Sequence, residues 1–374
     1  MIFRDLTVRQ QILAASLMRR GNVPTWAGAL DTPQSEPAAQ LIYERGDQYE
    51  RLSLPDLCGQ FLREEGLPQE CNAKETVRTA VSTATAANVF SAVANASLVA
   101  GFRLAPDSSD GWTSSAEATN FKNIDRVTGQ VGGLSKHPRG GDSRHVDFEA
   151  GKESYRIARY TGTFVVDEQD LIDDRMEALT RTPREMGASA RELRADLVCS
   201  ILLANKPLDT DSIDLFHADH NNLDTGGGSA LSATSLGTGV ARIAAQRVFA
   251  RALNLGARYL IVPANLHVAA RALLRTLDRA DRDNLILRSD DRLGVAGVVD
   301  PVDGTQYAGT TTNWWLSTSM QRTIEVSTLR DTGALPQLRE YLLTQGQYGI
   351  GWDVKYDIAA KSIDFRGLYQ SAGV

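Results

Sequence analysis

Apolar residues recur at near-helical spacing in residues 5–20, and a glycine and a proline follow, so we predict an amphipathic helix there. A polar, proline-bearing linker occupies roughly residues 31–48. Ser53 then stands where a helix N-cap would stand and Pro55 where a first-turn proline would, which predicts a second short helix. Residues 1–75 are therefore expected to form a separate small helical segment.

The chain changes character twice after this segment. Residues 76–105 are rich in alanine, serine, threonine and valine, whose small side chains would let a helix pack closely against a neighbour. Residues 107–143 are rich in glycine, serine and charge, which predicts a long, weakly packed excursion of a kind that is usually functional. Strand-like runs return within residues 144–166, so we expect the excursion to come back as a hairpin.

The clearest local signal is a capping box at Thr182-Pro-Arg-Glu185. It predicts a helix that begins at about Pro183 and ends near Asn205, before Pro207. Apolar residues continue through this stretch at steps of three or four. At about 1.5 Å per residue, the helix over 183–205 would be roughly 35 Å long. It would be longer than most helices of globular domains.

A compact α/β unit is predicted after the glycine-rich turn at 226–228. The apolar spacing from Val240 to Ala252 indicates a helix that Asn254 and Gly256 close. Later apolar runs indicate a strand at 259–262, a helix at 268–274 and strands at 314–317, 323–327 and 348–369. The fold class that follows from these elements is α+β.

The composition of the chain disfavours several classes of function. The 374 residues can bury one or two cores, and a net charge of −6 disfavours a DNA-wrapping role. Three cysteines without metal-type spacing are read as buried or idle thiols in a reducing cytoplasm. The N-terminus lacks an apolar stretch of signal-peptide length. Residues 84–101 are interrupted by polar side chains, and we expect them to fall short of a membrane span.

No common catalytic motif is present in the sequence, and Gly237-Thr-Gly239 lacks the third glycine of a nucleotide cradle. The dense group His217-Ala-Asp219-His220 is the weak metal candidate, since imidazole and carboxylate at this spacing bind divalent ions. The alternative is a polar turn whose side chains bond to the backbone, and we favour it. The pair Trp314-Trp315 is read as one residue on each side of a strand rather than a ligand platform. Catalytic residues and cofactors are thus expected to be absent.

Two charged regions remain. Asp170, Asp173 and Asp174 invite a general acid–base reading, but a solvated connection or an ion pair between subunits is the preferred interpretation. Residues 122–159 contain eight lysines or arginines against five acidic residues. Because acids are interleaved with the bases, we expect contacts with another protein surface rather than with DNA.

The order of these parts resembles the Hong Kong 97 fold of tailed-phage major capsid proteins. Several segments strengthen the resemblance, and they look most like the Mu-like head subunits that are often fused behind a prohead protease. They are Ala87–Phe102, Asp167–Asp174, Thr182–Gly187, Leu215–Leu223 and Tyr259–Pro263. The likeness extends over roughly residues 50–374.

The resemblance implies a division of the chain into named parts. These are a scaffold- or linker-like helical segment (1–75), an N-terminal arm (76–121), an extended loop (122–160), a peripheral domain with a spine helix at 183–205 (161–238), an α/β axial domain (239–325) and C-terminal strands (326–374). Two departures stand out. The loop stretch Lys136–His145 is more basic than is usual in the group, and no protease precedes Met1, so the chain is expected to be separately encoded or trimmed.

The function implied by the resemblance is a major capsid protein that self-assembles into an icosahedral shell around phage double-stranded DNA. Its implied partners are further copies in hexamers and pentamers, portal and scaffold or protease proteins, and enclosed DNA without sequence-specific contact, but no membrane. The implied location is the virion capsid, assembled in the bacterial cytoplasm. An encapsulin-like compartment is the first alternative, and a metal-dependent hydrolase at the His217 group is a remote one. Subunit-contact candidates are Lys136, Arg139, Arg144, Lys152, Arg156, Asp170, Asp173, Asp174, Arg184, Arg191 and Arg194.

Overall fold

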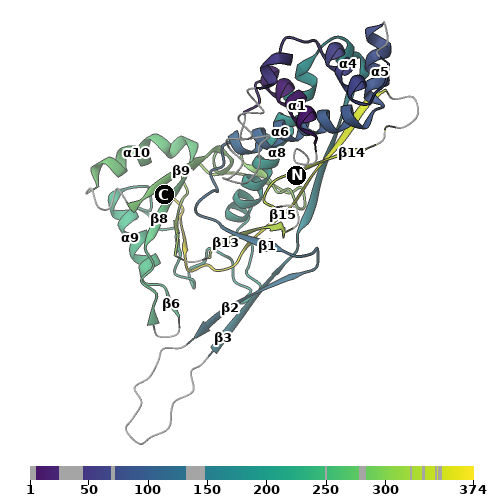
Figure 1. Ribbon diagram of the computed structural model, residues 1–374. Coiled ribbons are helices and arrows are strands. Elements are labelled where there is room, and N and C mark those ends of the chain that lie inside the picture. The colour runs from purple at the N-terminus through teal and green to yellow at the C-terminus, as the bar shows by residue number, and fades with distance from the viewer. Residues whose placement is uncertain are drawn as a thin grey trace, which may run out of the picture. The chain divides into compact units, whose positions relative to one another are not determined.

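The computed structural model describes residues 6–24, 45–68, 72–131, 148–248, 251–277, 284–320, 322–330, 333–341, 343 and 348–374. The chain divides into two compact units (Figure 1). Unit 1 comprises residues 1–106, 159–192 and 332–357, and unit 2 comprises residues 107–158, 193–331 and 358–374. Helices and strands are both present in each unit, which agrees with the predicted α+β class. The domain limits implied by the resemblance stay predictions.

Capped helices form the N-terminal part of unit 1. Thr7 and Ser53 each accept a hydrogen bond from the backbone and complete a capping box, and for Ser53 this confirms the predicted N-cap. Asn72 and Thr83 cap the next two helices. The elements are α1 (Val8–Arg20), η2 (Gly46–Tyr49), α4 (Leu54–Glu64), α5 (Ala73–Val81) and α6 (Ala84–Leu104).

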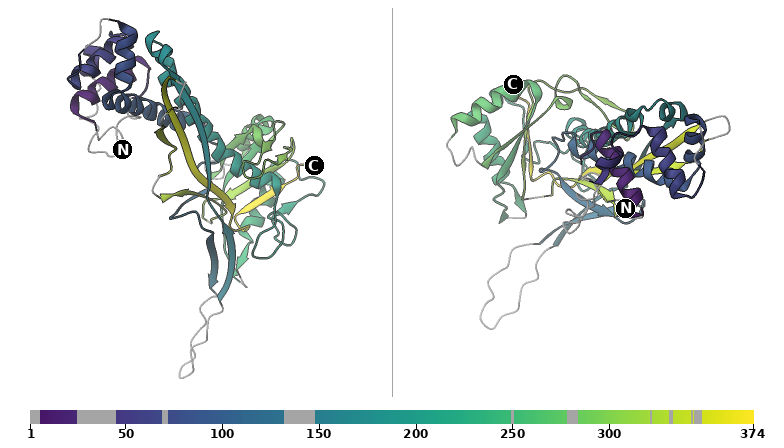
Figure 2. Two further views of the ribbon diagram at one scale, coloured as in Figure 1. Left: turned by 90° about the vertical axis from the view of Figure 1, so that its right-hand side faces the viewer. Right: turned by 45° about the horizontal axis from the view of Figure 1, so that its top comes forward.

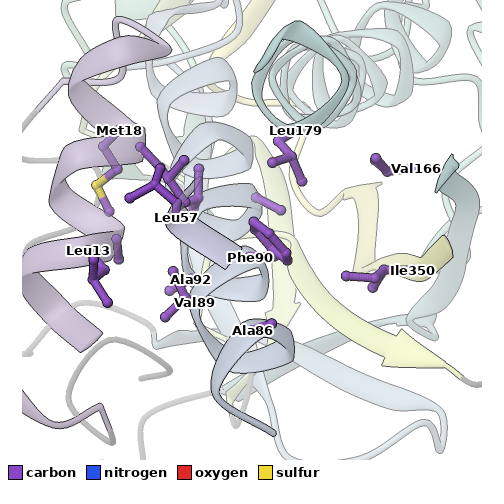
Figure 3. Close-up of a cluster of buried hydrophobic side chains, with 14 of the residues drawn as sticks. Leu13, Met18, Leu57, Ala86, Val89, Phe90, Ala92, Val166, Leu179 and Ile350 are labelled. Atoms are coloured by element: carbon purple, nitrogen blue, oxygen red, sulfur yellow. The ribbon is translucent and has the colours of Figure 1, made fainter. Parts of the chain in front are cut away.

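These helices share one hydrophobic core with later parts of unit 1. Figure 3 shows Leu13 and Met18 of α1 and Leu57 of α4 packed toward α6. Phe90 of α6 lies in the same cluster and meets Phe61 edge-on, with ring centroids 5.5 Å apart. Leu179, Val166 and Ile350 complete the cluster from more distant parts of the sequence. The expectation that residues 1–75 form a separate segment is therefore wrong for their described part.

The long helix α8 spans Met176–Ala204, so the predicted start at Pro183 is wrong by seven residues. Pro183 lies inside the helix, where it cannot donate the usual backbone hydrogen bond. Leu179 is fully buried in the core of unit 1, and this packing keeps the preceding turns helical. The capping-box pattern at Thr182 thus lies within α8 and does not mark the start of the helix. Residues up to Glu192 belong to unit 1 and the remainder to unit 2.

Two glycines let α6 and α8 approach closely within unit 1. A Cβ added at Gly101 would lie 1.9 Å from the carbonyl oxygen of Arg184. A Cβ added at Gly187 would lie 2.0 Å from the carbonyl oxygen of Leu98. The close helix packing predicted from the small residues of this stretch is confirmed.

The helix α6 is long and apolar enough to cross a membrane by length and composition alone, which contradicts the expectation that this stretch falls short. Its side chains are mostly buried within the protein. Val89, Phe90, Val93 and Leu98 belong to the core of unit 1. The helix is therefore the central helix of a protein core.

Cys58 and Cys199 are buried free thiols, as predicted. Burial raises the pKa of the Cys58 thiol to about 12 and also raises the pKa of Cys199. Since the thiolate is the reactive form, we expect neither residue to be alkylated by iodoacetamide at pH 8 in the folded protein. Peptide mass spectrometry before and after addition of denaturant measures this. Labelling of Cys58 in the folded chain at the rate seen in denaturant would contradict its burial.

Three strands and a short helix complete unit 1. The helix α7 (Glu168–Ile172) is capped by Asp167. Strand β14 (Gln337–Tyr341) pairs in antiparallel fashion with β15 (Gly349–Ser362), whose last residues belong to unit 2. The remaining strand is β4 (Ala158–Asp167).

Unit 2 is built around a five-stranded sheet in the order β5-β16-β12-β8-β9. Its strands are β5 (Leu223–Asp224), β16 (Leu368–Ser371), β12 (Trp314–Thr318), β8 (Ala257–Pro263) and β9 (Ile286–Asp290). The helices α9 (Ala233–Ala244) and α10 (His267–Thr276) pack on it through one apolar cluster. Trp314 lies in that cluster, whereas the adjacent Trp315 is buried outside it. The two rings thus face opposite sides of β12, as predicted.

The helix predicted over residues 240–252 is corrected to α9, which ends at Ala244. Ser232 and Ser235 form its capping box, so the helix begins earlier than the apolar spacing indicated. The side-chain amide of Gln246 donates to the carbonyl oxygen of His220. A short hairpin follows in the chain. The hairpin strands are β6 (Arg247–Val248) and β7 (Arg251–Ala252).

A second group of strands in unit 2 carries a long hairpin. Strand β1 (Ser114–Ala118) runs parallel to β13 (Ile324–Leu329), which pairs with the last residues of β15. The hairpin strands are β2 (Ile124–Val131) and β3 (Phe148–Tyr155). Smaller elements are η3 (Ala264–Leu266), η4 (Asp291–Leu293), β10 (Val298–Val299) and β11 (Gln306–Tyr307).

Candidate functional site

The β2–β3 hairpin is the most distinctive surface feature of unit 2. Both strands run side by side away from β1 and β13 (Figures 1 and 2), and within the described residues they pair only with each other. The apolar side chain of Val127 is 61% exposed on this ribbon. An isolated two-stranded ribbon is marginally stable in water. The hairpin predicted from the sequence is confirmed, and it offers a surface that a partner can cover.

A buried carboxylate on β13 fastens the first strand of the hairpin. The side chain of Glu325 is 2% exposed and accepts a hydrogen bond of 2.5 Å from Nε of Arg126. The hydroxyl of Tyr155 donates to the same carboxylate and also contacts the hydroxyl of Ser327. Burial raises the pKa of Tyr155, and the hydrogen bond to Glu325 raises it further. The phenol is therefore kept protonated, as a donor to Glu325.

A second buried carboxylate fastens the other strand. Glu153 of β3 has a fully buried side chain, and its oxygens accept bonds from the backbone N–H groups of Asp209 and Thr210 at 3.1 and 3.0 Å. Nζ of Lys361 lies 3.5 Å from the same carboxylate. Gly151 lies against Thr210, since an added Cβ would be 2.7 Å from its methyl carbon. The two glutamates thus tie both strands of the hairpin to the rest of unit 2.

The contact residues that the sequence predicts in the loop region are only partly covered by the described residues. Lys136, Arg139 and Arg144 lie outside the described residues. Lys152 is exposed and pairs with Asp125 at 2.8 Å across the hairpin, where its ammonium group lowers the pKa of that carboxyl group. Arg156 is exposed just after β3.

The acidic run before α8 makes contacts inside unit 1. The carboxylate of Asp174 accepts two bonds of 2.9 Å from the guanidinium of Arg20 and one of 2.7 Å from the backbone N–H of Leu54. Asp170 and Asp173 lie within 3.3 and 3.7 Å of Arg175. Asp174 therefore joins α1, α4 and the start of α8.

Replacing Asp174 by asparagine is expected to lower the free energy of unfolding by about 1 kcal/mol, because the hydrogen bonds lose their charge. Asparagine tolerates the left-handed backbone at this position, where φ is +57°, so the backbone is kept. Urea unfolding measures the effect. The control is Asp173→Asn, since Asp173 is 58% exposed and expected to change stability by less than about 0.5 kcal/mol. Equal effects of the two substitutions would contradict the role of Asp174.

The three arginines of α8 that the sequence predicts as subunit contacts differ in their surroundings. Arg184 donates to the carbonyl oxygen of Asn22 at 2.9 Å, and the guanidinium of Arg191 lies 5.2 Å from the ring centroid of Phe102. The side chain of Arg194 is only 7% exposed and is bound by Asp107, so it is enclosed within its own unit. Because its side chain is enclosed, Arg194 is no longer a candidate for contacts between subunits.

The His217 group forms a polar turn. Nδ1 of His217 accepts a bond from the backbone N–H of Asp219 at 3.2 Å. Nδ1 of His220 faces the carbonyl oxygen of Leu215 at 3.3 Å, and its Nε2 lies 3.0 Å from Asp211. The ring of His220 also stacks on Phe365, with centroids 3.8 Å apart. The interpretation as a turn bonded to the backbone is confirmed, and the described residues hold no group of three or more potential metal ligands.

The anchoring residues Glu153, Glu325 and Tyr155 were missed by sequence reasoning. The local signal is limited to the position of Glu325 between the apolar residues Ile324 and Val326, and the structure shows that this strand is buried along its whole length. Buried carboxylates need a partner. No local pattern identifies Arg126 as that partner, because the two residues are 199 positions apart.

A phage capsid protein family model matches residues 151–371 of the chain. The match covers more than half of the sequence, so the chain belongs to the phage capsid protein family. The family is one of structural shell proteins, which agrees with the predicted capsid function. No curated protein matches the chain.

Solved structures of shell proteins are similar to this chain at low sequence identity. The capsid of Ralstonia phage GP4 is 10% identical over 69% of this chain and 86% of that chain, with a TM-score of 0.47. The capsid of cyanophage P-SCSP1u is 10% identical over 69% and 85%, also with a TM-score of 0.47. The SrpI encapsulin complex from Synechococcus elongatus is 10% identical over 69% and 84%, with a TM-score of 0.41.

Proposed function

We propose that many copies of this chain assemble into an icosahedral shell of hexamers and pentamers that encloses phage double-stranded DNA. Membership in the phage capsid protein family supports the shell. The single structural observation that carries self-association is the hairpin, whose root is held by buried charges while Val127 is left exposed. Each contact between copies can be weak, because every subunit engages several partners at once.

The finer parts of the proposal rest on the sequence resemblance. Within the family, the chain belongs to the group of Mu-like head subunits. Its partners during assembly are portal proteins, together with scaffold or protease proteins. The particle forms in the bacterial cytoplasm and becomes the virion capsid. Particles isolated from lysed host cells should contain nuclease-protected double-stranded DNA. Particles filled with a protein cargo and free of DNA would instead favour a compartment of the encapsulin type.

The hairpin can be shortened while Arg126, Glu153 and Tyr155 at its root are kept. Arg126 and Glu153 face each other across the ribbon, so an Asn-Gly turn in place of residues 127–152 keeps both anchors and the register. We expect this variant to stay folded, with circular dichroism like that of the parent chain, and to form no shells in electron micrographs. Charge reversal of Lys136, Arg139 and Arg144 to glutamate, at full length, should reduce the yield of shells. Shells of parental size and yield from the shortened variant would overturn the role of the hairpin.

A further inference from the structure

The helix α6 is apolar on nearly every side, so it needs packing partners on more than one face. Every residue from Ser91 to Ala94 and from Ala96 to Phe102 is buried, which is more than one face of a helix accounts for. Helix α8 covers one side, where Gly101 and Gly187 allow the two helices to touch. An apolar helix that is exposed along its other sides is prone to aggregate in water or to bind a membrane. Other parts of unit 1 must therefore cover α6.

The described residues 6–24 and 45–68, here called the N-terminal cover, provide this packing. Side chains of α1 and α4 belong to the same hydrophobic cluster as Phe90 of α6 (Figure 3). Completely buried side chains of the cover include Leu17, Leu54, Leu57, Phe61 and Leu62. Burial of side chains of this size is the main favourable contribution to folding. Because a folded domain is only marginally stable, we expect unit 1 to unfold without them.

Polar contacts also tie the cover to later parts of unit 1. Nη2 of Arg184 in α8 donates to the carbonyl oxygens of Gly21 and Asn22 at 3.3 and 2.9 Å. These carbonyl groups follow the last turn of α1, where backbone acceptors lack partners within the helix. Asp174 accepts a bond of 2.7 Å from the backbone N–H of Leu54, at the start of α4. The cover is thus held by apolar packing and by directed hydrogen bonds.

We propose that the N-terminal cover stays on its own subunit throughout assembly and is retained in the finished shell. This role differs from the scaffold-like role that the sequence resemblance implies for residues 1–75. A segment can leave a particle only if the surface beneath it is stable in water, and the apolar face of α6 is not. The cover lies outside residues 151–371, which match the family model, so family membership alone does not decide its fate. The inference rests on the proposed shell function.

A disulfide bond between the cover and α8 tests whether the cover has to move. A Cβ added at Gly21 would lie 3.1 Å from Cβ of Thr180. Gly21→Cys combined with Thr180→Cys therefore places two cysteines at a spacing close to that of natural disulfides. The double variant is purified reduced, oxidised as a monomer and then assembled. Oxidised and reduced chains should give shells of equal diameter with yields within about twofold, because the locked contact is the same before and after assembly.

Shells that disappear on oxidation and return on reduction would overturn the inference, because the cover would then have to leave its site during assembly. A cysteine pair that does not oxidise in the folded chain would contradict the contact between the end of α1 and α8, and would overturn the inference as well. Thr180→Cys alone, oxidised in parallel, reports the contribution of the native cysteines.

Two aspartate substitutions on α1 separate the buried side of the cover from its outer side. Leu17 is fully buried, whereas Val8 is 59% exposed. Leu17→Asp should reduce the yield of soluble chain by about tenfold or more, because α6 would lose its cover, and Val8→Asp should leave it within about twofold. A soluble Leu17→Asp chain with the parental helix content in circular dichroism would be expected of a dispensable scaffold, and would overturn the inference.

Native particles show directly whether the cover is retained. Shells isolated from lysed host cells are digested, and peptides of α1 and α4 are quantified against peptides of α8 with isotope-labelled standards. The three helices should be present in equimolar amounts. Shells whose chains lack residues 6–68 would overturn the inference and leave the shell function intact. A chain that forms no shell under any condition would overturn the proposed function, and this inference with it.

Discussion

Glu325→Ala is expected to lower the free energy of unfolding of unit 2 by about 3 kcal/mol, because removing one partner of a buried ion pair leaves the other uncompensated. The guanidinium of Arg126 is 30% exposed and would keep part of its hydration, which places the value at the lower end of the usual range. Tyr155 would lose its carboxylate acceptor as well. Urea unfolding gives the loss of stability, and hydrogen exchange of the β2 and β3 amides shows whether the hairpin root has loosened.

The chain supplies a matched control on a neighbouring strand. Glu117 of β1 pairs with Arg330 at 3.2 Å, but both side chains are at least 60% exposed. Such surface pairs contribute about 0–1 kcal/mol, so Glu117→Ala should have a small effect. In a double-mutant cycle, Arg126→Met should add little to Glu325→Ala, since the pair is already broken. Equal losses from Glu325→Ala and Glu117→Ala would contradict the anchoring role of Glu325.

Gly101→Ala is the second substitution with a large expected effect, a destabilisation of about 3 kcal/mol. The added Cβ would meet a backbone carbonyl oxygen of α8, which cannot rotate away as a side chain can. The two helices would have to separate, and the core packing around α6 would loosen. Thermal unfolding of the purified chain and of the variant measures the loss.

Gly237 provides the control, because it lies within α9 and an added Cβ there meets no atom within 4 Å. Gly237→Ala should stabilise the protein by about 0.5–1 kcal/mol, since alanine favours the helix over glycine. If Gly101→Ala were as stable as the parent chain, the close approach of α6 and α8 would be contradicted.

Helices and strands whose formation depends on neighbouring residues could be predicted from the sequence. Thr7 and Ser53 cap helices because a side-chain oxygen bonds a nearby backbone N–H, an interaction that depends only on adjacent residues. The hairpin was likewise visible in a change of composition at both of its ends. Residues 259–262 formed the expected buried strand because their apolar run is continuous.

Elements decided by tertiary contacts were not predictable in this way. The start of α8 depends on the burial of Leu179 in a core that later strands complete, so the proline pattern alone was misleading. The end of α9 depends in part on the bond of Gln246 to the turn at His220. The anchoring of the hairpin joins Arg126 to Glu325 across 199 positions, which no local spacing reveals.

Different residues of the hairpin in unit 2 anchor it and remain exposed. The anchors at Glu153 and Glu325 tie the hairpin to the rest of unit 2, and the exposed residues along it are left for a neighbouring copy. In the proposed assembly these exposed residues are covered by a neighbouring copy, so the proposed functional site is a surface between copies.

Electron microscopy of the purified full chain tests the central claim most directly. The account predicts closed shells of uniform diameter with fivefold and sixfold clusters of subunits, formed from this single chain. Protein that remains monomeric at every salt and protein concentration would contradict it.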